Sequence, residues 1–241
     1  MIAHDIERKA KELCRDKTIA RAVCGSGFTA VELSDGAVGL SFRYPGIEGA
    51  KYAGTMAGRP ASDLVELVSS LSLQDSSLGI ATVNALTAGG RENIPSGSMY
   101  DFIDIKPSDT VGVIGNFGKM IDDIKQHSER TLVFELYPEQ DMYPIWAEPL
   151  LLPECDVVII TGATLINKTT NHIIASSTKA REIVLIGPSV VHMPEVFKFC
   201  GVTVLAGAEV IEPEKALHMV SEGAQGNFLI KQVTRPYYAR I

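Results

Sequence analysis

The chain has 241 residues, of which 46% are hydrophobic and 21% are charged, so it can bury a substantial core and is neither disordered nor fibrous. Its net charge of -7 and the lack of a basic stripe with interleaved aromatic residues exclude nucleic acid and an anionic membrane surface as expected partners. Neither a secretory signal nor an apolar run of the roughly 18 residues that span a bilayer is present, so we expect a cytoplasmic protein.

The first half of the chain predicts a small α+β domain. Apolar residues at helical spacing predict a helix from Asp5 to Cys14. Two helices are expected later, one starting at Pro60 and one from about Ser77 to Leu86, because glycines follow Leu86. Between them and the first helix, three β-rich runs separated by glycine-containing turns predict an antiparallel meander: Ile19–Cys24, Thr29–Leu33 and Val38–Phe42.

The second half predicts a different architecture. A polar stretch rich in glycine and proline, Arg91 to Ser98, is the expected linker, which divides the chain into domains at 1–98 and 99–241. Beyond it, short apolar runs alternate with helical patterns, which predicts a Rossmann-like parallel sheet covered on both faces. The five expected strands are Thr110–Ile114, Thr131–Phe134, Asp156–Ile160, Glu182–Ile186 and Val202–Leu205.

A ligand site is expected where these strands end, because ligands of open parallel α/β sheets bind beyond the carboxyl ends of the strands. Glycine, hydroxyl, amide and carboxylate residues follow the strands, although a tight turn or a helix cap explains any one of them. The candidate ligand-binding residues are Gly115, Asn116, Gly118, Glu135, Thr161, Gly162, Thr164, Asn167, Thr169, Gly187 and Ser189.

The loop after the first of these strands has the spacing G-x-x-G-x-x-G from Gly112 to Gly118, which departs from the dinucleotide fingerprint G-x-G-x-x-G. Glu135 lies 20 residues after Gly115, where an acid that binds a ribose would be expected. Backbone N–H groups of this loop are expected to cradle an anion. Thr164 is a candidate N-cap of the next helix.

In the first half, Asn84 lies in an otherwise small and apolar stretch, and we expect it to face the site of the other domain rather than solvent. The histidines have no ligand spacing, and only His192 is close to a strand end. The cysteines lie far apart without a C-x-x-C pair, which predicts buried free thiols and no protein metal site: Cys14, Cys24, Cys155 and Cys200.

Five motifs occur in a fixed order over nearly the whole chain: Val83–Leu86, Val113–Gly118, Ile160–Thr169, Leu185–Ser189 and Val204–Gly207. Together they resemble a family of prokaryotic proteins named for a suggested role in heavy-metal chelation. The resemblance implies an N-terminal domain similar to the capping domain of enolases, a Rossmann-like domain, and an active site between them. Enolase chemistry is not implied, because its acid, lysine and metal ligands belong to a barrel domain that is absent here.

Three functions remain open. The leading hypothesis is a cleft that binds or processes a small anionic or metal-chelating metabolite, or a metal complex. The second is an enzyme with NAD or S-adenosylmethionine in the Gly115 loop and Glu135 on the ribose. The third is a non-catalytic regulatory or structural subunit. The cofactor is unknown, and a homodimer is expected from the prevalence of dimers among soluble proteins.

Overall fold

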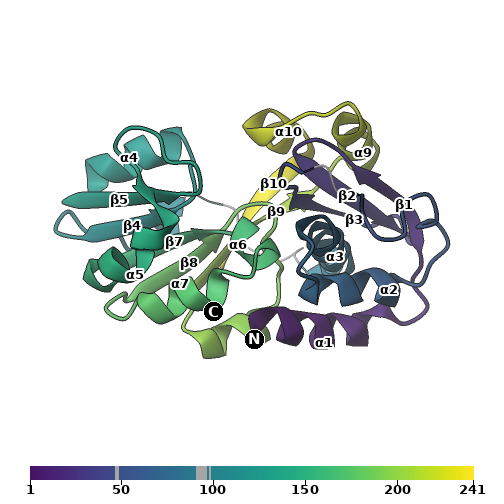
Figure 1. Ribbon diagram of the computed structural model, residues 1–241, viewed down its shortest axis with the longest axis horizontal. Coiled ribbons are helices and arrows are strands. Elements are labelled where there is room, and N and C mark those ends of the chain that lie inside the picture. Colours follow the sequence, from purple (N-terminus) through teal and green to yellow (C-terminus); the bar gives the residue numbers. More distant parts are fainter. Residues whose placement is uncertain (47–48, 91–96, 98) are drawn as a thin grey trace.

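A computed structural model describes residues 1–46, 49–90, 97 and 99–241 (Figure 1). It contains a three-stranded antiparallel sheet and a seven-stranded, largely parallel sheet, which confirms the predicted α/β class and the order of its two parts. The expected linker, Gly97 apart, lies outside the described residues.

The first sheet is the predicted meander, in the order β1-β2-β3. Strands β2 and β3 are largely buried, which means that both faces of this sheet are covered. The helices of the first half cover one face, and Gly39 lets the third of them approach, because a Cβ there would lie 2.1 Å from the Ala81 carbonyl oxygen. The elements are α1 (Ile2–Cys14), β1 (Ile19–Cys24), β2 (Phe28–Leu33), β3 (Val38–Phe42), α2 (Ala61–Val65), a 3₁₀ turn (Glu66–Ser69) and α3 (Leu73–Leu86), with 3₁₀ turns at Ala88–Gly90 and Met99–Asp101.

Three helix starts differ from the prediction. Helix α1 begins three residues earlier than expected, and α3 begins at Leu73 because Ser72 caps it by accepting a hydrogen bond from the Asp75 N–H. Pro60 lies just before α2 rather than within it.

The second sheet has the strand order β10-β9-β8-β7-β4-β5-β6, in which all neighbours except β9 and β10 are parallel. The five predicted strands are all present. Two strands were not predicted, the short β6 and the antiparallel edge strand β10. The strands are β4 (Thr110–Ile114), β5 (Arg130–Glu135), β6 (Tyr143–Pro144), β7 (Val157–Thr161), β8 (Glu182–Ile186), β9 (Val204–Val210) and β10 (Thr234–Arg240).

Helices cover both faces of the second sheet. Side chains of α4 pack with Val111 and Val113 on one face, whereas Ile160 and Leu132 face the core that includes Leu152 on the other. The helices are α4 (Lys119–His127), α5 (Glu148–Leu151), α6 (Ala163–Ile166), α7 (Thr170–Ser176), α8 (Pro194–Phe197), α9 (Pro213–Ser221) and α10 (Gly226–Val233), with 3₁₀ turns at Ile145–Ala147, Leu152–Glu154 and Lys198–Cys200.

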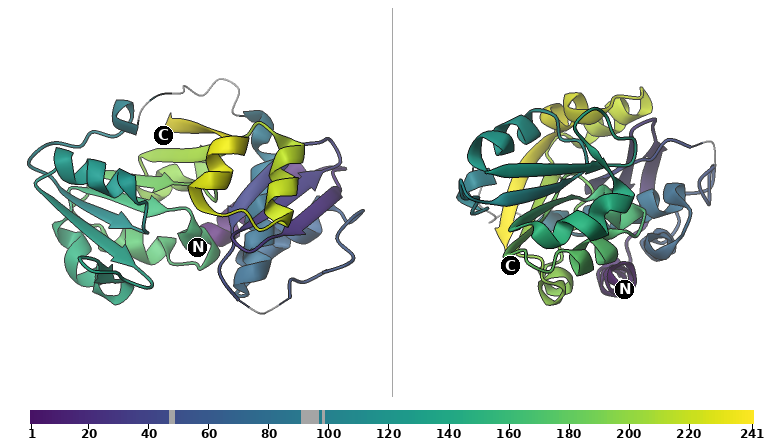
Figure 2. Two further views of the ribbon diagram at one scale, coloured as in Figure 1. Left: turned by 90° about the horizontal axis from the view of Figure 1, so that it is seen from above. Right: turned by 60° about the vertical axis from the view of Figure 1, so that its left-hand side comes forward.

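The last two helices leave the second sheet and cover the free face of the first one, as both views show (Figures 1 and 2). There, Phe28 and Leu40 share a buried cluster with Leu217 and Leu229. The other main cluster also joins the halves, since Ile6 of α1 belongs to the same cluster as Phe197 of α8. Residues distant in the sequence therefore build each core, and the two halves are packed into one body.

Candidate functional site

A cavity of about 620 Å³ lies where the strand order of the second sheet reverses. The chain runs outward from β4 through β5 to β6 on one side, and from β7 through β8 to β9 on the other. The crevice beyond the carboxyl ends of the two central strands is the usual ligand position in such sheets. The volume is also within the range of small-molecule sites.

Most of the predicted site residues meet at this cavity. Three do not line it: Asn84, Gly118 and Gly187. The residues that do line it come from loops after β4, β5, β7 and β8, as expected. They are Gly115, Asn116, Glu135, Thr161, Gly162, Thr164, Asn167, Thr169 and Ser189.

Asn84 joins the two halves of the protein instead of facing the cavity. It is 2% exposed, and its amide donates to the carbonyl oxygens of Leu40, at 2.9 Å, and Pro188, at 3.0 Å. The first bond reaches β3 and the second reaches the loop after β8. This asparagine therefore fixes the position of a cavity loop against the first sheet.

The loop that contains Gly115 is hydrogen-bonded to the carboxylate of Glu135. The N–H of Asn116 donates to Glu135 Oε2 at 2.8 Å, and the N–H of Leu136 donates to Glu135 Oε1 at 2.7 Å. The N–H of Gly118 donates to Asn116 Oδ1 at 3.0 Å. These amides are the ones expected to cradle an anion, so the geometry counts against an anionic group in this loop.

The segment after β7 supplies hydroxyl and amide groups. The Thr161 hydroxyl accepts from the Ala163 N–H at 3.3 Å, while the Thr164 hydroxyl donates to the Thr161 carbonyl at 2.8 Å. The expectation that Thr164 caps this helix is wrong, because the helix begins at Ala163 and Gly162 occupies the N-cap position. A Cβ on Gly162 would lie 2.7 Å from the Val190 backbone nitrogen, so glycine lets the β7 and β8 loops touch.

Asn167 links the cavity to the first half of the chain. Its amide nitrogen donates to the Tyr44 hydroxyl at 2.9 Å, and its oxygen accepts from the N–H and hydroxyl of Thr169. Burial, together with the negative charge of Glu135, raises the pKa of Tyr44 to about 12. Ser189 makes a similar link, because its hydroxyl accepts from the Phe42 N–H at 2.7 Å.

Lys168, between these residues, fastens α6 to the first half. Its ammonium donates to the carbonyl oxygen of Val68 and the hydroxyl of Ser76, each at 2.5 Å, and to the carbonyl oxygens of Leu165 and Ile166. The residue has a φ of 69°, which a non-glycine residue seldom adopts. Burial lowers the pKa of Lys168 to about 8.

The sequence did not predict several residues that line the cavity, among them Tyr44, Glu148 and His172. Glu148 is 4% exposed and opens α5, and burial raises the pKa of its carboxyl to about 7. Among the described residues, the carboxyl of Glu148 makes no hydrogen bond or ion pair. One signal was available, since Glu148 is the single charged residue in the apolar run from Ile145 to Leu152.

Aromatic side chains form much of the cavity wall. Phe42 packs edge-on against Tyr44, with ring centroids 5.1 Å apart, and Phe134 also lines the cavity. Trp146, the single tryptophan of the chain, lines the cavity while 73% of it is exposed. It therefore stands at the mouth.

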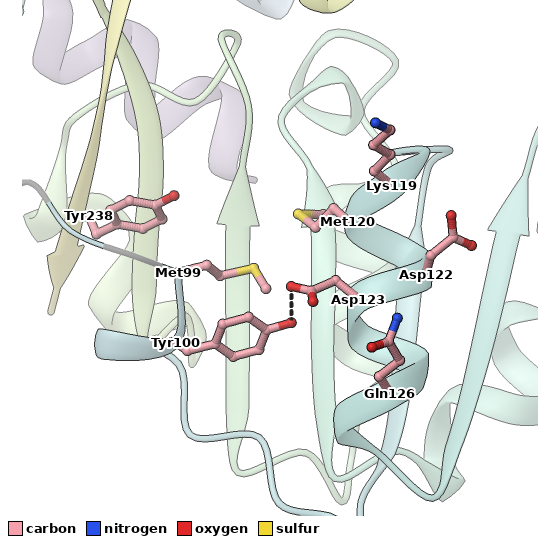
Figure 3. A pocket seen from close by; sticks show the side chains of 8 residues that line it. All are labelled: Met99, Tyr100, Lys119, Met120, Asp122, Asp123, Gln126 and Tyr238. Atoms are coloured by element: carbon pink, nitrogen blue, oxygen red, sulfur yellow. Dashed lines mark hydrogen bonds between the residues drawn. The ribbon is translucent and has the colours of Figure 1, made fainter.

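A second hollow of about 670 Å³ lies beside α4 and contains none of the predicted residues (Figure 3). Tyr100 faces α4 there, and its hydroxyl donates to Asp123 Oδ2 at 2.8 Å. The lining of this hollow includes no residue of the loops after β5, β7 and β8, whose polar groups line the first cavity.

The described residues include neither a cluster of metal ligands nor a membrane-spanning helix. In that part of the chain, no three His, Cys, Asp or Glu side chains gather in a group that could hold a metal ion. Likewise, no helix there is long and apolar enough to cross a membrane.

The fold and cavity define a two-part α/β protein with a Rossmann-type strand order and a cavity of about 620 Å³ at its switch point. The chain belongs to the family described as "Putative heavy-metal chelation", whose two segments match residues 6–87 and 98–239. The resemblance inferred from the sequence motifs is thereby confirmed.

Individual relatives agree with this assignment. An uncharacterised protein of Methanocaldococcus jannaschii is 27% identical over 186 residues, which cover 73% of this chain and 70% of that protein. A protein of unknown function from Desulfitobacterium hafniense DCB-2 has a similar structure, with a TM-score of 0.85, 22% identity and 99% of both chains covered. Another, from Pyrococcus horikoshii, has a TM-score of 0.86, 24% identity and full coverage of both chains. These two structures show the fold.

Proposed function

We propose that the protein binds, and by binding presents or processes, a small metal-chelating metabolite in the cavity at the strand ends of the second sheet. The observation that carries the proposal is the cavity itself, which has the volume of a metabolite site and is lined by carboxylate, hydroxyl and amide groups from both halves. The description of the family agrees with this ligand class.

The metal is assigned to the ligand rather than to the protein. A resident ion does not fit the donor set of the described residues, because a structural or catalytic site needs about three protein ligands. A chelating metabolite brings its own donor atoms. The cavity would then recognise the organic part of the complex, with hydroxyl groups such as those of Thr161 and Ser189 orienting it.

Native mass spectrometry with metal analysis tests the proposal on protein purified without affinity metal or added cofactor. We expect a retained small molecule or metal complex, and we expect Ala163→Phe to remove it by filling the cavity. Ala175→Phe, on an exposed turn of α7 outside the cavity, is the matched control. Retention of the same compound by Ala163→Phe would show that it binds elsewhere.

Protein that is isolated without a ligand can be tested by thermal denaturation with Ni²⁺ or Co²⁺, histidine or citrate, and the complexes. A ligand at about 100 times its dissociation constant stabilises the fold by roughly 2.7 kcal/mol, which is about 5 to 10 °C for a chain of this size. A shift with the complexes alone supports the proposal, whereas equal shifts with the free metal would contradict it.

The adenosyl-cofactor enzyme is the second candidate, and the position of the cavity at the switch point favours it. Glu135 also lies beside the Gly115 loop, as a ribose-binding acid would. Its two oxygens already accept backbone N–H groups, which weakens the case. Thermal denaturation with NAD, NADP and S-adenosylmethionine decides, since no shift with any of them removes this candidate.

We also propose that the protein is a cytoplasmic homodimer, because dimers are common among soluble proteins. The native mass spectrum gives the oligomeric mass directly. A monomer at micromolar concentration would remove the dimer and leave the ligand site unaffected.

A further inference from the structure

Glu148 is 4% exposed and lines the cavity, and its carboxyl has no hydrogen-bond or ion-pair partner among the described residues. A polar group of this kind is costly to bury unless something completes its hydrogen bonds. By contrast, both carboxylate oxygens of Glu135 accept hydrogen bonds from backbone N–H groups. Glu148 is therefore the cavity group whose bonding is left for a ligand to complete.

The ionisable side chains that line the cavity are mostly acidic. The described residues that line it include Glu135 and Glu148 but no lysine or arginine, and the histidine among them, His172, is exposed. A negative ligand group would meet repulsion here, while a positive group would be attracted. The electrostatic potential in the cavity therefore favours a positively charged ligand group over a negatively charged one.

The walls add a second attraction for a cation. Phenylalanine and tyrosine rings from the first sheet and from the β4 and β5 loops line the cavity, and Trp146 stands at the mouth. The face of an aromatic ring attracts a positive charge, and this attraction is strongest for tryptophan. Aromatic walls with a carboxyl group are a typical setting for an organic ammonium ion.

We infer that the cavity takes a ligand with a protonated nitrogen, which the Glu148 carboxylate binds while the aromatic walls enclose the adjoining carbon skeleton. The inference rests on the proposed function, because it names a chemical group of the metabolite that the cavity binds. A chelating metabolite with an amine meets both requirements. Burial, which raises the pKa of Glu148, is consistent with a carboxyl that awaits a cation.

Three probes of one shape test the inference: phenethylamine, 2-phenylethanol and phenylacetate carry a cation, a neutral group and an anion on the same skeleton. Trp146 fluorescence reports binding, because it is the single tryptophan and lines the cavity. We expect the amine to bind at least about tenfold more tightly than the alcohol, as a charged hydrogen bond gives. Glu148→Gln should abolish the preference and Glu195→Gln, at an exposed position on α8, should keep it.

The comparison of probes in the unaltered protein needs no variant, so a poorly folded Glu148→Gln would not hide the answer. Equal affinities of the three probes, or a preference that survives in Glu148→Gln, would overturn the inference and leave the ligand cavity in place. No binding of any probe overturns it as well. Failure of the proposed function is seen separately, as a bare native mass spectrum and no shift with any chelate.

Discussion

Glu135 and Glu148 are the same residue type in one cavity, but their surroundings differ. Glu135 accepts two backbone N–H groups at 2.8 and 2.7 Å, so its charge stabilises the turns after β4 and β5. Glu148 is 4% exposed and lies against apolar neighbours, so its charged form is disfavoured. Glu135 therefore stabilises the loops of the cavity, whereas the carboxyl of Glu148 can bond to a ligand that enters it.

The stability of the protein should depend on pH, because Glu148 is buried. Its pKa of about 7 in the folded state lies above the value of 4.5 expected when unfolded, so the folded state holds a proton that the unfolded state loses between these values. Stability contributed by this group is therefore lost as pH rises from about 4.5 to 7. Glu148→Gln, which cannot ionise, should be up to about 3 kcal/mol more stable than the wild type at pH 8 and equal to it near pH 4.5.

Urea unfolding at both pH values measures this difference. The exposed Glu195→Gln is the matched control and should show no change between them. A Glu148→Gln protein as stable as the wild type at pH 8 would mean that the carboxyl is solvated or partnered.

The cavity residues that directly follow the parallel strands could be predicted, because strand ends of a parallel sheet converge whatever the details of packing. Thr161 and Ser189 are of this kind. Tyr44 and Glu148 could not be found in the same way, since they follow an antiparallel strand and a short 3₁₀ turn. Their positions depend on how the two sheets pack, which no local pattern states.

At the scale of elements, Lys168 is the main polar link between α6 and the first half. Helix α6 has only four residues, and Thr164 and Asn167, in and just after it, face the cavity. Such a short helix has little stability of its own, so its place depends on what holds it. The Lys168 ammonium holds it by bonding to Val68 and Ser76 on the opposing elements.

Replacing Lys168 by methionine should therefore loosen α6. The apolar chain keeps its volume, but the carbonyl oxygens that the ammonium satisfied lose a donor, which costs about 1 to 3 kcal/mol. Urea unfolding measures the loss, and Lys198→Met, at an exposed position, is the control. A stability equal to that of the control would show that α6 is held by apolar packing alone.

The predicted elements succeeded where the pattern was long and failed where it was short or interrupted. The ends of β1, β3, β4 and β8 match the predictions. Strand β6 has only two residues, and β10 contains Pro236 and carries charges at both ends, so neither resembles a buried strand. Both lie at edges of the sheet, where the apolar signal is weakest.

At the scale of the molecule, the two halves are not independent. Helices α9 and α10 complete the core over β2 and β3, and α1 packs with α8 (Figures 1 and 2). The sequence predicted two domains in succession, because short apolar runs alternating with helical patterns begin at Asp109. It could not show that the last helices return to the first sheet, because an amphipathic helix does not say which sheet it covers.

This packing predicts one unfolding transition. Neither half can lose its structure without exposing the core of the other, so the halves should melt together. Differential scanning calorimetry should give a single peak whose calorimetric and van't Hoff enthalpies agree. Two separated peaks would show that the halves are independent domains.

The return of α9 and α10 to the first sheet also has a consequence during synthesis. The apolar face that holds Phe28 and Leu40 leaves the ribosome long before Leu217 does, with 170 residues (43–212) between the end of β3 and the start of α9. At roughly 5 to 20 residues per second, that face waits about 10 to 35 s for its cover. A nascent chain of this protein therefore has a period in which a chaperone, or another chain, can occupy the place of its own last helices.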